Sequence, residues 1–120
     1  MRLIGLDAGS VTVKIVVFDN ENNSISYKFY ERHKGYPVHL SYKILSQIID
    51  NNKDDYFISV TGSAGRLIAK ILGIEPVNEI VAQAIATRKL FPHIRTIIEM
   101  GGEDSKLILL GEGEALIQDF

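Results

Sequence analysis

The sequence predicts an α/β fold, and three observations support that prediction. The segments come in the order of three strands, a helix, a strand, two helices and a strand–glycine–strand unit. Hydrophobic residues make up 46% of the chain and charged residues 23%, which is ordinary for globular proteins and excludes disorder. A chain of 120 residues is long enough to bury a core and fits one domain.

The first three strands are predicted from short apolar runs. Residues 2–7 form an apolar run that ends on a carboxylate, and residues 13–19 form a second, β-branched run. Only residues 8–12 separate the two runs, so we expect a hairpin. Residues 24–30 alternate apolar and polar side chains, which predicts a half-buried strand.

A helix, a strand and a second helix follow. Apolar side chains recur at helical spacing over residues 38–50, and residues 57–60 form a short buried strand. Ser63 is placed to cap a helix that runs to Leu72, with Gly73 as its C-terminal stop.

The last part of the chain begins with a helix over residues 77–90, preceded by Pro76 and ended by Phe91 and Pro92. Its apolar face is expected to hold four residues: Ile80, Val81, Ala84 and Ile85. Strands are predicted at 96–100, 106–110 and 115–117, with glycine turns between them.

Two parts of the chain resemble each other. LIGLDAGSVTVKIVVF and IIEMGGEDSKLILL both run strand, acidic residue, glycine turn, hydroxyl, lysine, strand, which suggests two related lobes. We expect residues 1–93 to form the first lobe and 94–120 the start of a second. That start has no helix of its own, so we expect a fragment whose residues 96–120 pack on the first lobe, pair with a second copy or lack order.

Charge and composition exclude several function classes. The net charge of −2 argues against a nucleic-acid partner, and no apolar run reaches the ~20 residues of a membrane span. The first residues lack a secretory signal pattern, so the expected location is cytoplasmic. The chain has no cysteine, and its three histidines show no metal-binding spacing.

The residues from Asp7 to Lys14 form the first candidate site. Gly9 allows the backbone to approach a ligand, and successive N–H groups in such a turn form a nest for phosphate oxygens. Ser10 and Thr12 add hydroxyl donors, and Lys14 adds positive charge. Asp7 is placed to hold Mg²⁺ through water. A plain hairpin turn is the alternative reading.

A second candidate site follows the strand at residues 96–100. Gly101 and Gly102 again permit close approach, and Glu99 precedes them. Glu103 and Asp104 are placed to orient or deprotonate a water for attack on a γ-phosphate. Two such turns facing each other would clamp a polyphosphate and its metal. The alternative is a hairpin whose charges face solvent.

Two further features carry charged or hydroxyl side chains. The turn from Thr61 to Arg66 is either an anion site at a helix N-terminus or a tight turn followed by an ordinary serine cap. Glu79 is expected to face solvent. Neither a Walker A loop nor a GxGxxG fingerprint is present.

DAGSVTVK and EMGGEDSKLI resemble the two phosphate motifs of the acetate and sugar kinase, heat-shock chaperone and actin superfamily. Together with VTGSAGR, NEIVAQAIA, FPHIRTIIEMGGEDSKLI and LIQDF, they resemble the BadF/BadG/BcrA/BcrD-type ATPases, which activate 2-hydroxyacyl-CoA dehydratases and benzoyl-CoA reductases. The resemblance implies an RNase H-like, actin-like ATPase lobe with a mixed sheet, plus the opening hairpin of a second similar lobe.

The resemblance also implies what the residues do. Two lobes would close on Mg-ATP, and hydrolysis would drive electron transfer from a [4Fe–4S] cluster to the dehydratase or reductase partner. Asp7 would be an acid associated with Mg²⁺. The first phosphate turn would be lined by Gly9, Ser10, Thr12 and Lys14, and the second by Gly101, Gly102 and Asp104. The cluster would bridge a homodimer.

The sequence departs from the family at several positions. Glu99 stands where the family has Asp, Glu103 where it has Gln, and Gln83 near a family His. The cysteines that would hold the cluster are absent from these residues. We therefore expect the parent to be an ATPase and this part to be inactive alone. The alternatives are a sugar-kinase-like phosphotransferase and a non-catalytic interaction module that keeps the fold.

Overall fold

The computed structural model describes residues 1–50, 55–101, 104–111 and 115–119. The chain divides into two compact units, Met1–Pro76 and Val77–Phe120. This division differs from the boundary that the sequence suggested between residues 93 and 94, because a helix assigned to the first lobe packs within the second unit.

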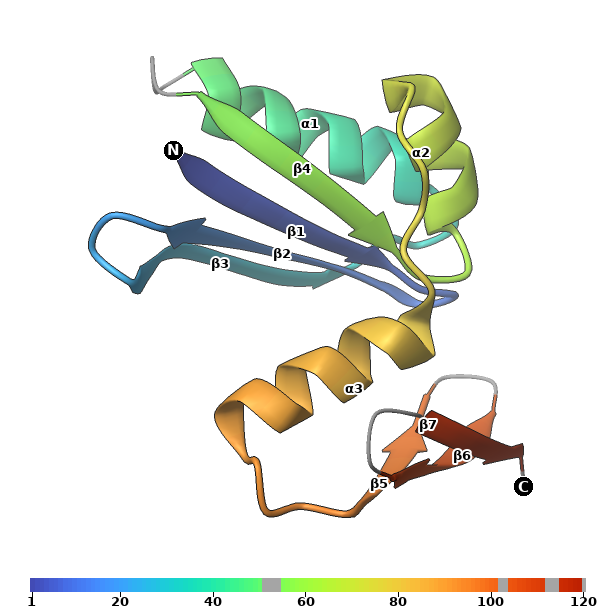
Figure 1. Cartoon of the computed structure of the whole chain (residues 1–120). Coiled ribbons are helices and arrows are strands. Elements are labelled where there is room, and N and C mark those ends of the chain that lie inside the picture. The colour runs from blue at the N-terminus through green and yellow to red at the C-terminus, as the bar shows by residue number, and fades with distance from the viewer. Residues whose placement is uncertain (51–54, 102–103, 112–114, 120) are drawn as a thin grey trace. The chain divides into compact units, whose positions relative to one another are not determined.

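The first unit contains a four-stranded mixed sheet with two helices on one face (Figure 1). Its strands lie in the order β3-β2-β1-β4, with β4 parallel to β1 and the other pairs antiparallel. A helical crossover joins β3 to β4, since antiparallel strands need only a turn but a parallel strand needs a long connection. The elements are β1 (Arg2–Ala8), β2 (Thr12–Asp19), β3 (Ser24–Arg32), α1 (Pro37–Asp50), β4 (Tyr56–Thr61) and α2 (Gly65–Leu72).

The core of the first unit lies between the sheet and its helices. Alternate residues of β1 and β2 are buried there, together with Ile44 and Leu45 of α1 and Ile68 of α2. The buried strand residues are Ile4, Leu6, Ala8, Val13, Ile15 and Val17. Because side chains alternate along a strand, Asp7 and Lys14 point to the opposite face of the sheet from α1 and α2.

Two local predictions in the first unit were wrong. β3 is almost entirely exposed rather than half-buried, because it is the edge strand and lies beyond the area that the helices cover. The residue at the N-cap of α2 is Ala64, with no side-chain cap, so Ser63 does not cap the helix. The predicted stop at Gly73 is confirmed, since it has a left-handed φ of 73°.

The second unit is a helix and a three-stranded antiparallel sheet of order β5-β6-β7. Its elements are α3 (Glu79–Leu90), β5 (Thr96–Met100), β6 (Ser105–Leu110) and β7 (Ala115–Asp119). Ile80 and Ala84 of α3 pack with Ile108 and Leu110 of β6. The expectation that these strands lack a covering helix was therefore wrong.

Helix α3 also differs in detail from its prediction. It begins two residues later, at Glu79, because the side chain of Asn78 accepts hydrogen bonds from the N–H groups of Ile80 and Val81. Only Ile80 and Ala84 of the predicted apolar face are buried. Gly102, Glu103 and two of the three residues of the predicted turn at 111–113, Glu112 and Gly113, lie outside the described residues. In the described part of the chain, no helix has the length and apolarity to cross a bilayer.

Candidate phosphate-binding site

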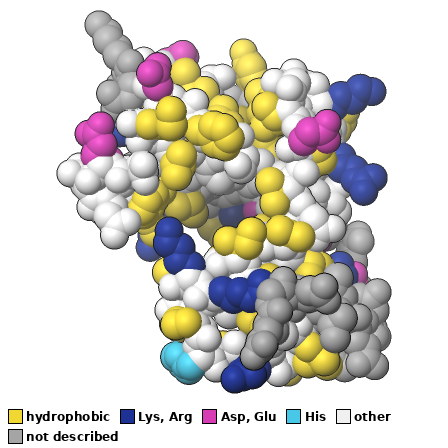
Figure 2. Space-filling view, viewed as in Figure 1, with side chains coloured by type: hydrophobic (Ala, Val, Ile, Leu, Met, Phe, Trp, Pro, Cys, Tyr) yellow, Lys and Arg dark blue, Asp and Glu magenta, His cyan; other side chains and the backbone are white. Residues whose placement is uncertain are grey.

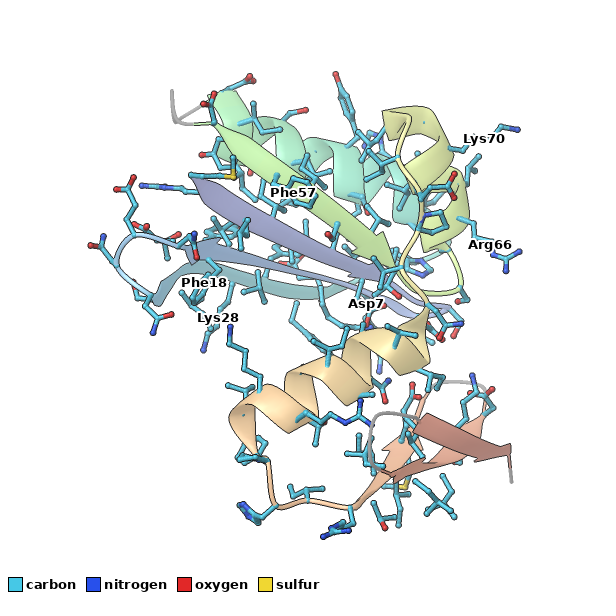
Figure 3. The ribbon with its side chains drawn as sticks, in the orientation of Figure 1. Asp7, Phe18, Lys28, Phe57, Arg66 and Lys70 are labelled. Atoms are coloured by element: carbon cyan, nitrogen blue, oxygen red, sulfur yellow. The ribbon has the colours of Figure 1, made fainter. Side chains whose placement is uncertain are left out.

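Asp7 and Lys14 form an ion pair across the β1–β2 hairpin. They are direct partners in the antiparallel ladder, and Nζ of Lys14 lies 3.3 Å from Oδ2 of Asp7. The side chains are 42% and 31% exposed, so both can be reached from solvent. Asp7 lies close to the end of β1 (Figure 3). The hairpin therefore places an anion and a cation side by side at the mouth of its turn.

The turn between β1 and β2 presents two backbone N–H groups. The N–H of Gly9 donates to the carbonyl of Thr12 at 2.9 Å, so it closes the turn and is not free for a ligand. Within the described part of the chain, the N–H groups of Ser10 and Val11 have no acceptor. The phosphate nest that the sequence suggested is therefore reduced to these two amides. No sequence pattern had singled out Val11, because its side chain is apolar and only its backbone is relevant.

The backbone at Gly9 lies close to the ammonium group of Lys14. A Cβ atom at Gly9 would lie 3.5 Å from Nζ of Lys14, which is ordinary contact. The side chain of Lys14 thus extends over the turn as well as toward Asp7. A ligand oxygen at the turn would meet the ammonium group and the free amides together.

The turn after β4 supports the end of β1. The N–H of Ala64 donates to the carbonyl of Ala8 at 2.8 Å, and the N–H of Gly65 donates to the carbonyl of Gly62 at 2.9 Å. These two amides are used within the fold, which favours the tight-turn reading over an anion site. Arg66 is exposed on α2 and points away from Asp7 (Figure 3).

The second hairpin repeats the pairing of the first. Glu99 lies opposite Lys106 in the β5–β6 ladder, as Asp7 lies opposite Lys14. The N–H of Gly101 donates to the carbonyl of Asp104 at 2.9 Å, which matches the Gly9–Thr12 bond. The lysine, however, pairs differently: Nζ of Lys106 lies 3.5 Å from Oδ2 of Asp104.

The two hairpins differ in how they are covered. Lys106 alternates with the buried Ile108 and Leu110, so it shares the face of the sheet that α3 covers. Oε2 of Glu99 is buried, and no donor among the described residues reaches it. Burial acts to lower the pKa of Lys106, but the carboxylates of Asp104, Glu79 and Glu99 outweigh it and raise that pKa. Glu79 is thus half-buried near a lysine rather than directed simply to solvent.

The metal chemistry that these residues fit is limited. The described residues contain no group of three acidic, histidine or cysteine side chains placed to hold a metal ion. Asp7 is an accessible carboxylate beside the turn between β1 and β2. A single carboxylate suits Mg²⁺ that keeps much of its water and takes other ligands from phosphate oxygens. The chain lacks cysteine, so these residues do not fit an iron–sulfur cluster.

Comparison with solved structures identifies the fold. The chain is similar to the (R)-2-hydroxyglutaryl-CoA dehydratase component A of Acidaminococcus fermentans, with 21% identity and a TM-score of 0.75 over 99% of this chain and 48% of that one. It is also similar to the activator of the 2-hydroxyisocaproyl-CoA dehydratase from Clostridium difficile, solved with bound ADPNP. There the identity is 24% and the TM-score 0.72, over 99% of this chain and 46% of that one.

An exopolyphosphatase from Cytophaga hutchinsonii shares the fold more distantly, with 18% identity and a TM-score of 0.66 over 100% of this chain and 50% of that one. The chain spans about half the length of these three proteins. No protein-family model matches the chain, and no curated protein sequence does. The predicted α/β, actin-like ATPase fold and the resemblance in fold to dehydratase activators are confirmed.

Proposed function

We propose that this chain is the N-terminal part of an ATPase that binds Mg-ATP and activates a 2-hydroxyacyl-CoA dehydratase or benzoyl-CoA reductase. One observation carries the proposal: the Asp7–Lys14 pair at 3.3 Å beside a turn with two free amides. The shared fold with two dehydratase activators, one solved with an ATP analogue, supports the same reading.

The first turn is proposed to hold the nucleotide's phosphates. The N–H groups of Ser10 and Val11, the hydroxyls of Ser10 and Thr12 and the ammonium of Lys14 would bind phosphate oxygens, while Gly9 permits their close approach. Bonds from charged or polar donors to phosphate are the strong class of hydrogen bond. Asp7 would orient the waters of the Mg²⁺ that travels with ATP.

The second turn is proposed to act on the same nucleotide. Gly101 and Gly102 would line its phosphates, and Asp104 with Glu99 would orient the attacking water. The likeness of the two hairpin registers supports this assignment. The two turns lie in different units of the chain. We propose that closure of the two lobes of the whole protein strengthens nucleotide binding.

The partner would be the dehydratase or reductase component, and the whole protein would couple hydrolysis to electron transfer toward it. Any [4Fe–4S] cluster of the whole protein would need ligands that these 120 residues do not supply. We therefore assign nucleotide binding and orientation of the attacking water, but no electron-transfer step, to this part of the protein. We also propose a cytoplasmic location for the protein.

Isothermal titration calorimetry with Mg-ATP tests the proposal. We expect binding tighter than roughly 1 mM, about −4 kcal/mol, and loss of that binding in Asp7→Asn. Asp55→Asn is the matched control, because it removes an exposed carboxylate at the start of β4, away from the turn. Equal binding by both variants would reject the assignment of Asp7.

Inorganic tripolyphosphate distinguishes a nucleotide site from a simple polyphosphate site. If the chain binds tripolyphosphate and ATP equally, the adenosine contributes nothing to the affinity, and a site for inorganic polyphosphate is the better interpretation. If neither ligand binds and the turn stays folded, the non-catalytic interaction module becomes the better reading.

A further inference from the structure

We propose that His33 positions the phosphate turn by holding the carbonyl of Gly9, so that the N–H of Ser10 is directed outward to a ligand. His33 directly follows β3, and it is 8% exposed. The sequence offered no metal-binding spacing for this histidine. Its role becomes visible only from the contacts of its ring. The phosphate part of this inference rests on the proposed function.

Both ring nitrogens of His33 have partners, and they define its proton. The N–H of Gly35 points to Nδ1 at 3.1 Å, and Nε2 lies 2.9 Å from the carbonyl oxygen of Gly9. A backbone N–H only donates, so Nδ1 must accept. The proton of the neutral ring is therefore on Nε2, where it is donated to Gly9.

The bond to Gly9 sets the direction of the next amide. The carbonyl of Gly9 and the N–H of Ser10 belong to one planar trans peptide, so they point in opposite directions. Holding the carbonyl toward the buried ring turns the Ser10 N–H away from it. This N–H is one of the two in the turn that have no acceptor among the described residues.

The backbone of His33 holds the other side of the same turn. Its N–H donates to the carbonyl of Val11 at 3.0 Å. The turn is therefore tied at Gly9 by the side chain and at Val11 by the main chain, while Gly9 and Thr12 close it internally at 2.9 Å. His33 is a positioning residue, since it acts through the turn and does not touch the ligand.

Two substitutions separate the two functions of the ring. His33→Gln keeps a donor at about the distance of Nε2, whereas His33→Asn keeps an acceptor near Nδ1 but no donor that reaches Gly9. His39→Asn is the matched control, because His39 is exposed on α1 of the same unit. Thermal unfolding of each variant shows whether it folds.

The affinity for Mg-ATP is measured by calorimetry on the full chain. We expect His33→Asn to bind at least tenfold more weakly and His33→Gln to stay within threefold of the unsubstituted protein. Similar affinities for the Asn and Gln variants, whether both retained or both lost, would overturn the inference.

A second measurement does not depend on nucleotide binding. The residual dipolar coupling of the Ser10 N–H reports its direction, and hydrogen exchange of the Gly9 N–H reports closure of the turn. We expect both to change in His33→Asn and to be preserved in His33→Gln. If the protein does not bind ATP, the proposed function fails, and these two readouts still decide whether His33 positions the turn. Unchanged readouts in both variants would reject it.

Discussion

Gly62 lies so close to Asp7 that a Cβ atom at Gly62 would be 2.6 Å from Oδ1 of the carboxylate. The same Cβ would also collide with the carbonyl of Ala8. Gly62 has a φ of 101°, a backbone conformation that residues with a side chain rarely adopt. The turn after β4 therefore packs against the end of β1 as bare backbone, and it limits where the Asp7 side chain can go.

Gly62→Ala is expected to lower the free energy of unfolding by more than about 2 kcal/mol, because strain at positive φ adds to the collision with Ala8. Urea denaturation measures this change. Gly5→Ala in β1 is the control, since a Cβ there meets nothing within 4 Å. An equal, small effect of both substitutions would show that the β4 turn can move away from β1.

Lys14→Met is expected to weaken Mg-ATP binding at least tenfold while changing the unfolding free energy by less than about 1 kcal/mol. The Asp7–Lys14 pair is partly exposed, and such pairs contribute little to stability. Calorimetry and urea denaturation measure the two effects separately. Lys28→Met on the exposed strand β3 is the control, and it should alter neither quantity (Figure 3). A large loss of stability with unchanged binding would assign Lys14 to the fold alone.

Asn78→Ala is expected to destabilise the protein by about 1 kcal/mol, because it removes the side-chain cap of α3. The second unit should be affected most, since α3 covers β6 there. Hydrogen exchange of the α3 and β6 amides locates the loss. Asn78→Asp should restore the stability, because its carboxylate accepts the same bonds. Failure of this rescue would show that the cap is not what Asn78 contributes.

Because of Asp19, the free energy of unfolding is expected to depend on pH in the acid range. Hydrogen bonds from the N–H groups of Asn22 and Glu21 hold the pKa of Asp19 below its ordinary value of 3.8. A pKa that is lower in the folded than in the unfolded protein stabilises the fold at pH values above the unfolded-state pKa. This contribution is lost as the pH falls through the folded-state pKa.

Urea denaturation of the protein and of Asp19→Asn tests this expectation. The difference between their unfolding free energies should be constant above about pH 5 and shrink progressively at lower pH. Asp55→Asn, which removes an exposed carboxylate directly before β4, should show no matching convergence. If the difference in unfolding free energy stayed constant into the acid pH range, the proposed role of these hydrogen bonds would be contradicted.

Self-association is a further prediction, and we expect it to occur through the unpaired edge of β5. This strand lies at one side of the three-stranded sheet, and Ile98 on it is 63% exposed. Unpaired strand edges are templates for another chain. Sedimentation velocity should show concentration-dependent dimers that Ile98→Lys reduces. Ile25→Lys on β3, the edge strand of the other sheet, should leave them in place. Equal effects would reject a β5-specific contact.

Exposed apolar side chains are widespread on the first unit as well (Figure 2). Phe57, Leu67 and Ile71 are each more than half exposed. Leu67 and Ile71 line a groove of about 650 Å³ between α1 and α2. Dimers that persist unchanged in Ile98→Lys would assign the contact to these surfaces and not to β5.

The sequence by itself determined the order and nearly the bounds of every helix and strand, because each prediction depended on local patterns. Periodic apolar residues marked the elements, and Gly73 and Pro92 marked helix ends. The candidate residues Asp7, Gly9 and Lys14 were also found locally, since a carboxylate, a glycine turn and a lysine stand within eight positions.

Only the tertiary structure decided which groups face one another. It exposed β3 by placing it at the sheet edge, and it joined α3 to β6 through Ile80 and Ile108. It also brought Gly62 and His33 to the first turn from distant parts of the chain. Local periodicity carries no information on such long-range contacts, because they depend on how strands pair and on which backbone groups remain to be satisfied.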